Sequence, residues 1–332
     1  MYSKRILSVL VVLSFISQAL VVVDTDSYTS VVVEDSSILE ELYGENGARS
    51  RTVENATLLK DIAAGNSGSN PQSFFAHTDG NLYFSAGGNA CYRSDGTEEG
   101  TVSFSDGHCT YFVSLGDTLL FAKEHETYGW ELHSYDGSSE PVIVKDIWDE
   151  KNSLGDPMDG IDPNNINTPQ LWPISVNDEF LLFTARNESS NSELWRTDGT
   201  EDGTYMVKDI NTNGESQPGF YFPLDEDRVL FNAKSGSARQ LWITDGTEVG
   251  TYLVEDINPD ADAMVQWFTR HNDQVYFMAK TGNYQDSPRE IWTTDGTQAG
   301  TYAITNPNDF HLLTPAMPLG DILIFKGDTQ EY

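Results

Sequence analysis

Short apolar runs recur along the chain from about residue 57 onward, each four to seven residues long and separated by polar residues. Aromatic and β-branched residues fill these runs, and Asp, Gly and Asn bound them, which is the pattern of short β-strands joined by tight turns. No stretch of this region has the apolar period of a long amphipathic helix. The clearest run, of the type Leu-Tyr-Phe, recurs at residues 82–84, 119–121, 181–183, 229–231, 275–277 and 323–325.

A second phrase repeats between these runs, of the form Glu-Leu-Trp-x-x-Asp-Gly-Thr-x-x-Gly-Thr-x-x-x-Lys-Asp-Ile. Residues 193–210 carry it throughout, and residues 241–257 and 290–301 carry close copies. The Asp-Gly steps begin at residues 95, 136, 198, 245 and 295, at intervals of 41, 62, 47 and 50 residues. Several copies in register indicate an array of similar structural units.

The pattern predicts four short strands in each unit. In the fourth unit they cover residues 220–224, 228–233, 240–244 and 251–257. Four antiparallel strands every 40–50 residues, apolar on both faces, predict an all-β fold built from the blades of a β-propeller. We expect a partial sixth unit at residues 312–317 and 322–325, completed by an amino-terminal strand at residues 58–62, because such a strand removes exposed sheet edges. The five complete units begin near Ser73, Tyr111, Leu171, Phe220 and Met264.

The repeated residues are predicted to be architectural, because a residue present in every unit serves the stacking of units. The Asp of each Asp-Gly step is expected to bond the backbone ahead, while its Gly accepts a positive φ. The Asp of each Lys-Asp-Ile phrase is expected to bond backbone donors in a neighbouring turn. The residues of this repeat set are Trp195, Trp242 and Trp292 for packing between blades, Asp198, Asp245 and Asp295 for the turns, and Asp61, Asp146, Asp209 and Asp256 in Lys-Asp-Ile.

The repeated phrase resembles that of the ELWxxDGT repeat proteins, a family of mostly exported microbial proteins. The resemblance covers about residues 57–332, with Cys91 and Tyr92 in place of Leu-Trp in the first unit and His133 in place of Trp in the second. It implies a propeller-like, secreted or surface protein without established catalytic residues.

The amino terminus indicates export. Lys4 and Arg5 precede an apolar run and small residues at Ser17 and Ala19, which is the arrangement of a secretory signal peptide; an uncleaved anchor is the alternative. We therefore predict a signal peptide or anchor at residues 1–23, an acidic linker at 24–56 and a β-propeller repeat domain at 57–332. The sixth unit lacks its Leu-Trp strand, so either the last residues are a shortened strand or the sequence is part of a longer repeat protein, which we favour.

Composition changes this interpretation in two ways. The chain has 52 Asp and Glu against 19 Lys and Arg, a net charge of −33. This excludes nucleic acid as a partner, because affinity for a phosphate backbone depends on Lys and Arg, and it gives no attraction to anionic lipid. Cys91 and Cys109 fit an oxidising compartment, where they form either a disulfide or two buried thiols.

The 62-residue interval contains an insertion at residues 148–170, which is the first choice for a partner site because long insertions often carry a scaffold's specific function. It is rich in carboxylate and amide oxygens, the ligands that Ca²⁺ prefers. The sequence therefore offers a calcium site at Asp156, Asp159, Asp162 and Asn164, against the alternative of a solvated loop.

No metal-ligand spacing of histidines, nucleophile elbow or phosphate-binding loop is present in the sequence. The favoured function is a secreted or cell-surface scaffold that binds an extracellular protein or glycan without catalysis. The alternatives are an extracellular propeller enzyme acting on polysaccharide, as a hydrolase or lyase, and a purely architectural segment of a larger surface protein.

Overall fold

The computed structural model describes residues 58–63, 68–87, 90–162, 173–188, 191–282, 289–305, 311–312, 317–319, 322–324 and 327–328. Secondary structure in these ranges consists of strands, turns and bends, so no described helix is long and apolar enough to cross a membrane. The predicted signal peptide or anchor and the predicted linker lie outside the described residues and stay predictions.

The strands form five four-stranded antiparallel sheets, each in chain order, which is the meander of a propeller blade. The predicted all-β fold class, built from β-propeller blades, is confirmed. The sheets are β1–β4 (Gln72–Ala76, Leu82–Ala86, Ala90–Ser94, Val102–Asp106), β5–β8 (Cys109–Leu115, Thr118–His125, Gly129–Tyr135, Val142–Lys145), β9–β12 (Ile174–Val176, Phe180–Arg186, Ser192–Thr197, Tyr205–Lys208), β13–β16 (Gly219–Pro223, Val229–Ser235, Ala238–Thr244, Tyr252–Glu255) and β17–β20 (Gln266–His271, Gln274–Ala279, Glu290–Thr294, Tyr302–Ala303).

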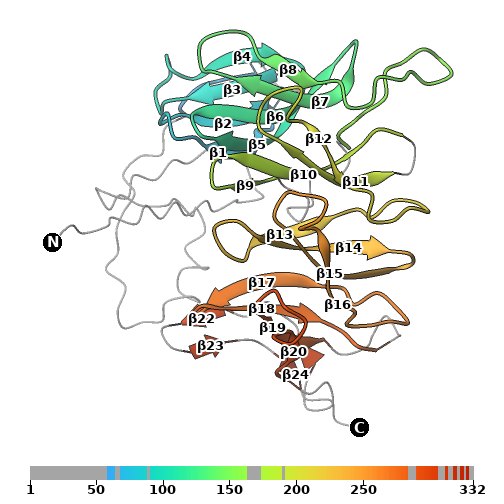
Figure 1. Ribbon diagram of the computed structural model, residues 1–332. Helices are drawn as coiled ribbons and strands as arrows, with labels where there is room; N and C mark the ends of the chain where they lie inside the picture. The colour runs from blue at the N-terminus through green and yellow to red at the C-terminus, as the bar shows by residue number, and fades with distance from the viewer. Residues whose placement is uncertain are drawn as a thin grey trace, which may run out of the picture. The chain divides into compact units, whose positions relative to one another are not determined.

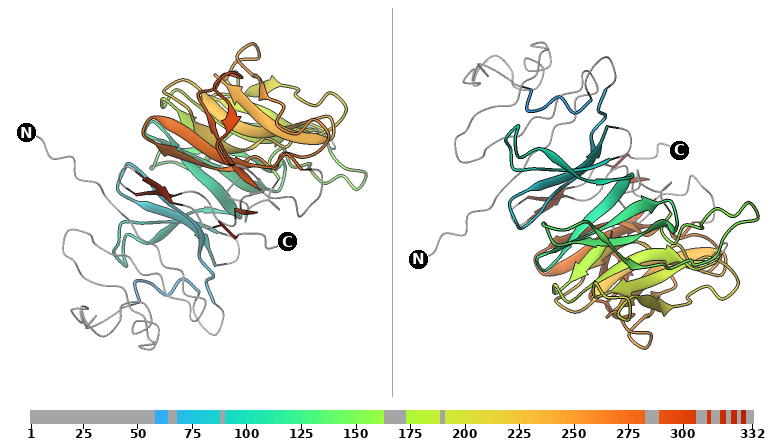
Figure 2. Two further views of the ribbon diagram at one scale, coloured as in Figure 1. Left: turned by 90° about the horizontal axis from the view of Figure 1, so that it is seen from below. Right: turned by 90° about the horizontal axis from the view of Figure 1, so that it is seen from above.

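The chain divides into two compact units. Of the described residues, the first comprises those at 58–76 and 80–106 and contains the sheet β1–β4; the second comprises those at 77–79 and from 107 onward and contains all later strands. Within the second unit, the sheets β9–β12, β13–β16 and β17–β20 lie one against the next as layers (Figure 1). The views from below and above show the twist of the individual sheets (Figure 2).

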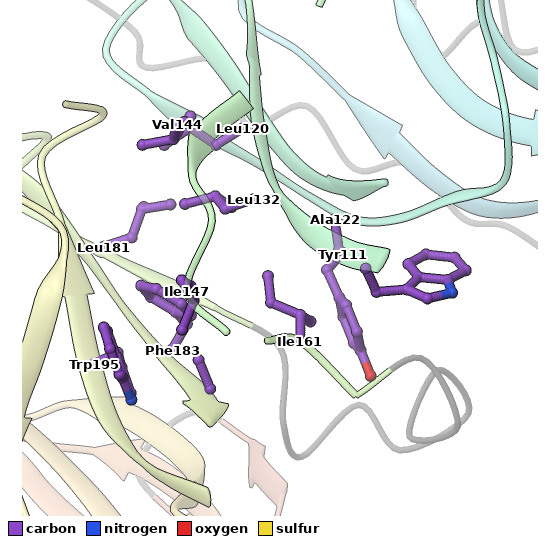
Figure 3. Close-up of a cluster of buried hydrophobic side chains, with 12 residues drawn as sticks. Tyr111, Leu120, Ala122, Leu132, Val144, Ile147, Ile161, Leu181, Phe183 and Trp195 are labelled. Carbon is purple, nitrogen blue, oxygen red and sulfur yellow. The ribbon is translucent and has the colours of Figure 1, made fainter. Parts of the chain in front are cut away.

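Stacking of the sheets explains why neighbouring residues of one strand are both buried. In β11, Leu194 and Trp195 are 0% and 5% exposed, although their side chains leave opposite faces of the sheet. Trp195 joins the cluster that contains Leu120 and Leu132 of the preceding sheet, whereas Leu194 joins a cluster with residues of the following sheet. In Figure 3, Leu181 of β10 points toward Leu132 of β7. Trp242 and Trp292 occupy the corresponding places in the next two inter-sheet clusters.

The repeated Asp-Gly-Thr phrase forms one hydrogen-bonded turn between the third and fourth strands. In the third sheet, Asp198 Oδ1 accepts hydrogen bonds from the backbone N–H and the hydroxyl of Thr200, at 2.9 and 2.6 Å. The Thr200 hydroxyl oxygen accepts the N–H of Gly203, and the Thr204 hydroxyl donates to the Thr200 carbonyl. The same bonds recur at residues 95–101, 245–251 and 295–301.

Two glycines of this turn are required for different reasons. Gly199 has a φ of +87°, which L side chains rarely adopt. Gly203 has an ordinary φ, but a Cβ there would overlap the carboxylate of Asp198. The turn therefore needs Gly at both places, which explains the spacing of the repeated phrase.

The Lys-Asp-Ile phrase works differently from its prediction. Asp146 Oδ1 is buried and bonds no described residue, so this Asp does not bond a neighbouring turn through that atom. The lysine makes the contact instead: Lys145 Nζ donates to the Thr204 carbonyl at 2.8 Å, in the Asp-Gly-Thr turn of the following sheet. Lys208 makes the corresponding bond to the Thr251 carbonyl at 2.9 Å.

The amino-terminal phrase also differs from its prediction. Residues 58–62 are not in strand conformation. Lys60 Nζ donates to the Glu98 carbonyl at 3.1 Å, so a side chain rather than a backbone ladder holds this phrase to the turn after β3. After β20, the described residues form two pairs rather than a sixth blade. These are β21 with β24 (His311–Leu312, Gly327–Asp328) and β22 with β23 (Met317–Leu319, Ile322–Ile324).

Candidate functional site

A cavity of about 470 Å³ opens among the second to fifth sheets, within the second unit. Its walls come from the ends of the sheets opposite to the Asp-Gly-Thr turns, where the hairpins between second and third strands and the loops between sheets meet. This size falls in the range of small-molecule binding sites. The lining side chains with polar or aromatic groups are Tyr111, Asp162, Phe183, Thr184, Arg186, Ser192, Glu215, Gln217, Phe220, Asn232, Arg239, Asp262 and Gln266.

Bulges in the first strands of two sheets shape this cavity. The register of β5 against β6 shifts between Thr110 and Val113, and that of β13 against β14 shifts between Gly219 and Phe222. Inside these shifts, Tyr111 and Phe220 both have a φ of +56°, in the left-handed region. A bulge re-aims the side chain that it contains, and here both side chains line the cavity.

An ordered polar network forms one side of the cavity. Arg239 at the start of β15 donates to the Gln217 carbonyl at 2.8 Å and to the Gln217 side-chain oxygen. The Gln217 amide donates in turn to Glu215, whose carboxylate lies 3.7 Å from Lys234 Nζ. Burial lowers the pKa of Arg239, opposed by the charges of Asp262 and Glu215. These contacts hold the guanidinium in one orientation before any ligand arrives.

The insertion supplies part of the opposite side. Gly160, Ile161 and Asp162, near its described end, all line the cavity, and Ile161 lies beside the ring of Tyr111 (Figure 3). Arg186 at the end of β10 donates its Nε–H to the Asp159 carbonyl at 3.0 Å and lies 4.0 Å from Asp162 Oδ2. The segment predicted as a partner site therefore contributes directly to the cavity wall.

Asn232 of β14 has an acceptor that no described residue satisfies. The residue is 3% exposed, and its Nδ2 donates to the Val265 carbonyl at 2.8 Å. Because a carbonyl can only accept, this bond fixes which end of the amide carries nitrogen. The Oδ1 atom is then buried without a hydrogen-bond partner in the described part of the chain, on a side chain that lines the cavity. An unsatisfied buried acceptor costs about 1–3 kcal/mol, so this atom lowers the stability of the folded chain.

The cavity wall uses positions at which the units differ. The residue after the Leu-Tyr-Phe type run is Ala122, Thr184 or Asn232 in the second, third and fourth sheets, and all three line the cavity. By contrast, the Asp and both Gly residues of the turn phrase are identical in the third, fourth and fifth sheets. The architecture is thus repeated at one end of the sheets, and individual side chains are presented at the other.

The three proposed calcium ligands that the structure describes each have a separate protein contact. Asp156 Oδ2 accepts from the Asn152 amide, Asp159 Oδ1 accepts from the Trp130 N–H, and Asp162 faces Arg186. Among the residues that the structure describes, no three His, Cys, Asp or Glu side chains form a metal-binding group. Asn164 lies outside the described residues, so calcium binding stays a prediction.

The sequence interpretation missed the buried acids of the Glu-Leu-Trp phrase. Glu193 is fully buried and accepts the N–H of Ile210 and of Ser216, both at 2.9 Å. Glu131 accepts the N–H of Gly160 at 2.9 Å, and burial raises its pKa to about 8. A Glu or Gln that recurs directly before an apolar pair of the third strand was the available signal. These acids bind the loops between sheets, which are the loops that form the cavity rim.

Cys91 of β3 and Cys109 of β5 are both fully buried, and neither is a free thiol. The pairing of these two residues with each other stays a prediction.

No known family profile matches the chain, and no curated protein sequence is similar to it, so the resemblance to the ELWxxDGT repeat proteins stays a prediction. Its structure is similar to that of putative TolB from Agrobacterium tumefaciens, with 12% identity, a TM-score of 0.39 and coverage of 72% of this chain and 82% of that one. It is also similar to the β-propeller domain of the Trilobed protease from Pyrococcus furiosus, with 14% identity, a TM-score of 0.42 and coverage of 72% of this chain and 70% of that one. A third similar structure is oligopeptidase B from Leishmania major, with 12% identity, a TM-score of 0.43 and coverage of 74% of this chain and 35% of that one. These similarities carry no argument about what this chain binds or does.

Proposed function

We propose that this protein is an exported, non-catalytic binding propeller that takes part of an extracellular protein or glycan into the cavity among its second to fifth sheets. The observation that carries the proposal is that the shared and the unshared positions of the repeat have different roles. The turn residues shared by the units bond within the turns, whereas the cavity is lined at positions where the units differ. Individual side chains on a repeated scaffold are the usual basis of a specific binding site.

Two further observations support the proposal. Neither Cys91 nor Cys109 is a free thiol, which fits an oxidising compartment and therefore export. The network from Arg239 through Gln217 to Glu215 holds its side chains in place without a ligand, which lowers the entropy lost on binding.

The polysaccharide-cleaving alternative is not favoured by the carboxylates that line the cavity. Asp162 faces Arg186, Glu215 faces Lys234 and the Gln217 amide, and Asp262 accepts the N–H of Met264 at 2.8 Å. Each is thus engaged in a contact that holds a loop or a guanidinium.

The test uses the full chain, labelled with a fluorophore, on arrays of glycans and of peptides. We expect saturable binding to features of one array. Ser192→Trp should abolish it, because Ser192 lines the cavity and an indole there would fill it. The matched control is Ser237→Trp, which places the same side chain at an exposed hairpin position outside the cavity lining. Absence of binding on both arrays, or binding that Ser192→Trp leaves intact, would contradict the proposal.

A further inference from the structure

We infer that the proton on Glu131 controls part of the cavity wall: the protonated carboxyl holds residues 147–161, the rim segment, in the closed position, and loss of the proton opens this segment. The consequence for ligand binding rests on the proposed function. The experiment that tests the inference needs no ligand, so its result is separate from that of the arrays.

The first step is the position of this carboxyl in the cavity wall. Glu131 of β7 is 0% exposed, and its Oε1 accepts the N–H of Gly160 at 2.9 Å and that of Trp148 at 3.3 Å. Gly160 lines the cavity, and its carbonyl accepts the backbone N–H of Arg186, another lining residue, at 2.9 Å. One buried side chain thus holds the rim segment near both of its ends and fixes a part of the wall.

The second step is the other oxygen of the carboxyl. Glu131 Oε2 is buried and bonds no described residue. The corresponding acid of the third sheet, Glu193, has donors on both oxygens, because Ser216 supplies its N–H to Oε1 at 2.9 Å and its hydroxyl to Oε2 at 2.5 Å. Gly160 takes the place of Ser216 and has no hydroxyl. An ionised Glu131 would therefore keep a charged oxygen buried without a donor, which is costly.

The third step is the form of the side chain that completes such a site. In the fourth sheet, Gln240 Oε1 accepts the N–H of Ile257 at 3.1 Å, and its Nε2 donates to the Asn258 carbonyl at 2.8 Å. A protonated carboxyl resembles this amide in shape and likewise has one acceptor oxygen and one donor group, whereas a carboxylate has no donor. The protonated form of Glu131 is therefore the form that matches Gln240.

The fourth step is the charge around Glu131. The charged or titratable groups on the elements around it are Lys123 of β6, His133 of β7, Asp146 after β8, Asp149 and Asp159 of the rim segment and Arg186 of β10. Burial and the charge of Asp146 disfavour the carboxylate and raise the pKa of Glu131 to about 8. Lys123 lies opposite Glu131 in the ladder and favours the carboxylate, while burial lowers the pKa of His133 to about 4 and keeps its ring neutral. The proton is therefore retained at neutral pH.

The direction of the pH effect follows from the two states of the rim segment. Opening exposes the Glu131 carboxyl to water, where its pKa returns to the ordinary value of 4.5. The closed segment then holds a proton that the open segment releases. Between pH 4.5 and about 8, the equilibrium constant for opening should rise about tenfold per pH unit, and outside this range it should level off.

The experiment is amide hydrogen exchange of the full chain without ligand, read by mass spectrometry on peptides that cover the rim segment and corrected for the intrinsic exchange rate. We expect the protection factor of this segment to fall about 100-fold between about pH 5.5 and 7.5, and to level off above about pH 8. The exchange should be the same in about 1 M urea, because a local opening exposes little surface.

Three variants locate the proton. Glu131→Gln introduces the amide that the fourth sheet has at Gln240, so protection of the rim segment should no longer depend on pH. Asp146→Asn removes a charge that opposes ionisation, so protection should level off at a lower pH than in the wild type. Glu140→Gln is the matched control, because it removes an exposed carboxyl between β7 and β8, and it should behave as the wild type does.

The other outcomes overturn the inference. Protection that is independent of pH in the wild type would do so, as would a pH dependence that Glu131→Gln retains. Exchange that accelerates in urea as global unfolding does would show that the rim segment does not open by itself. If Glu131→Gln does not fold, Asp146→Asn decides, and an unchanged levelling-off pH contradicts the inference. None of these results alters binding on the arrays, and absence of binding there leaves the exchange result standing.

Discussion

The two ends of the sheets in the second unit show opposite relations between repetition and chemistry. At one end, the Asp-Gly-Thr turns of the third, fourth and fifth sheets contain the same residues in the same hydrogen bonds, as at Asp198 and Asp245. At the other end, equivalent positions hold Ala122, Thr184 and Asn232, and their side chains line a cavity. A repeat therefore leaves its variable positions available for recognition once its constant positions have fixed the backbone.

The largest effect on stability is expected in the Asp-Gly-Thr turns. Gly203→Ala places a Cβ against the carboxylate of Asp198, so the turn must open or lose its hydrogen bonds. We expect the free energy of unfolding to fall by about 3 kcal/mol, measured by denaturant titration. The control is Asp202→Ala at the exposed neighbouring position, which should change the free energy of unfolding by less than about 0.5 kcal/mol. Equal losses of stability in the two variants would contradict the steric explanation for the repeated Gly.

An intermediate, pH-dependent effect is expected at Glu131, which binds the loop of the cavity rim at Gly160. Burial raises the pKa of its carboxyl from 4.5 to about 8, so the folded chain holds a proton that the unfolded chain releases. Stability is therefore greatest below the unfolded pKa and falls as pH rises through the folded pKa, by up to about 1.4 kcal/mol per pH unit.

Glu131→Gln tests this, because the fourth sheet already has Gln240 at the corresponding position, where its Oε1 accepts the N–H of Ile257. We expect the variant to be more stable than the wild type at pH 8 by about 2 kcal/mol and equal to it near pH 4, measured by urea titration at both values. A stability difference that does not change with pH would show that the carboxyl is ionised in the folded chain.

The smallest effects are expected at the lysines that connect successive sheets. Lys208→Met should lower the free energy of unfolding by about 1 kcal/mol, because its Nζ bonds the Thr251 carbonyl of the following sheet. The next sheet has Glu255 in place of this lysine. Glu255→Lys should therefore raise the free energy of unfolding by up to about 1 kcal/mol, by adding the bond that the third sheet already has. A loss of stability in Glu255→Lys would mean that the connection does not transfer between sheets.

The periodic pattern predicted the sheets well because strand and turn signals are local. The short apolar runs and the Asp-Gly step depend on residues a few positions apart, so the four strands of each sheet and the turn at Asp198 could be predicted without coordinates. Proximity along the chain did not reveal that Lys145 reaches the turn of the next sheet, while Oδ1 of Asp146 bonds no described residue. The insertion, predicted as a partner site, contributes residues 160–162 to the cavity lining, whereas Asn232 and Arg239 gave no signal of their own in the sequence.

The all-β fold, the blade as its repeating unit and the chemistry of the turns follow from the sequence alone, because each depends on short-range sterics and hydrogen bonding. Which unrepeated residues meet depends instead on the tertiary structure. Residues 162, 186, 217, 232 and 239 lie on different strands and loops and converge because stacked sheets bring corresponding ends together. The unsatisfied oxygen of Asn232 likewise became visible only there, since satisfaction of a polar atom depends on neighbours from other sheets.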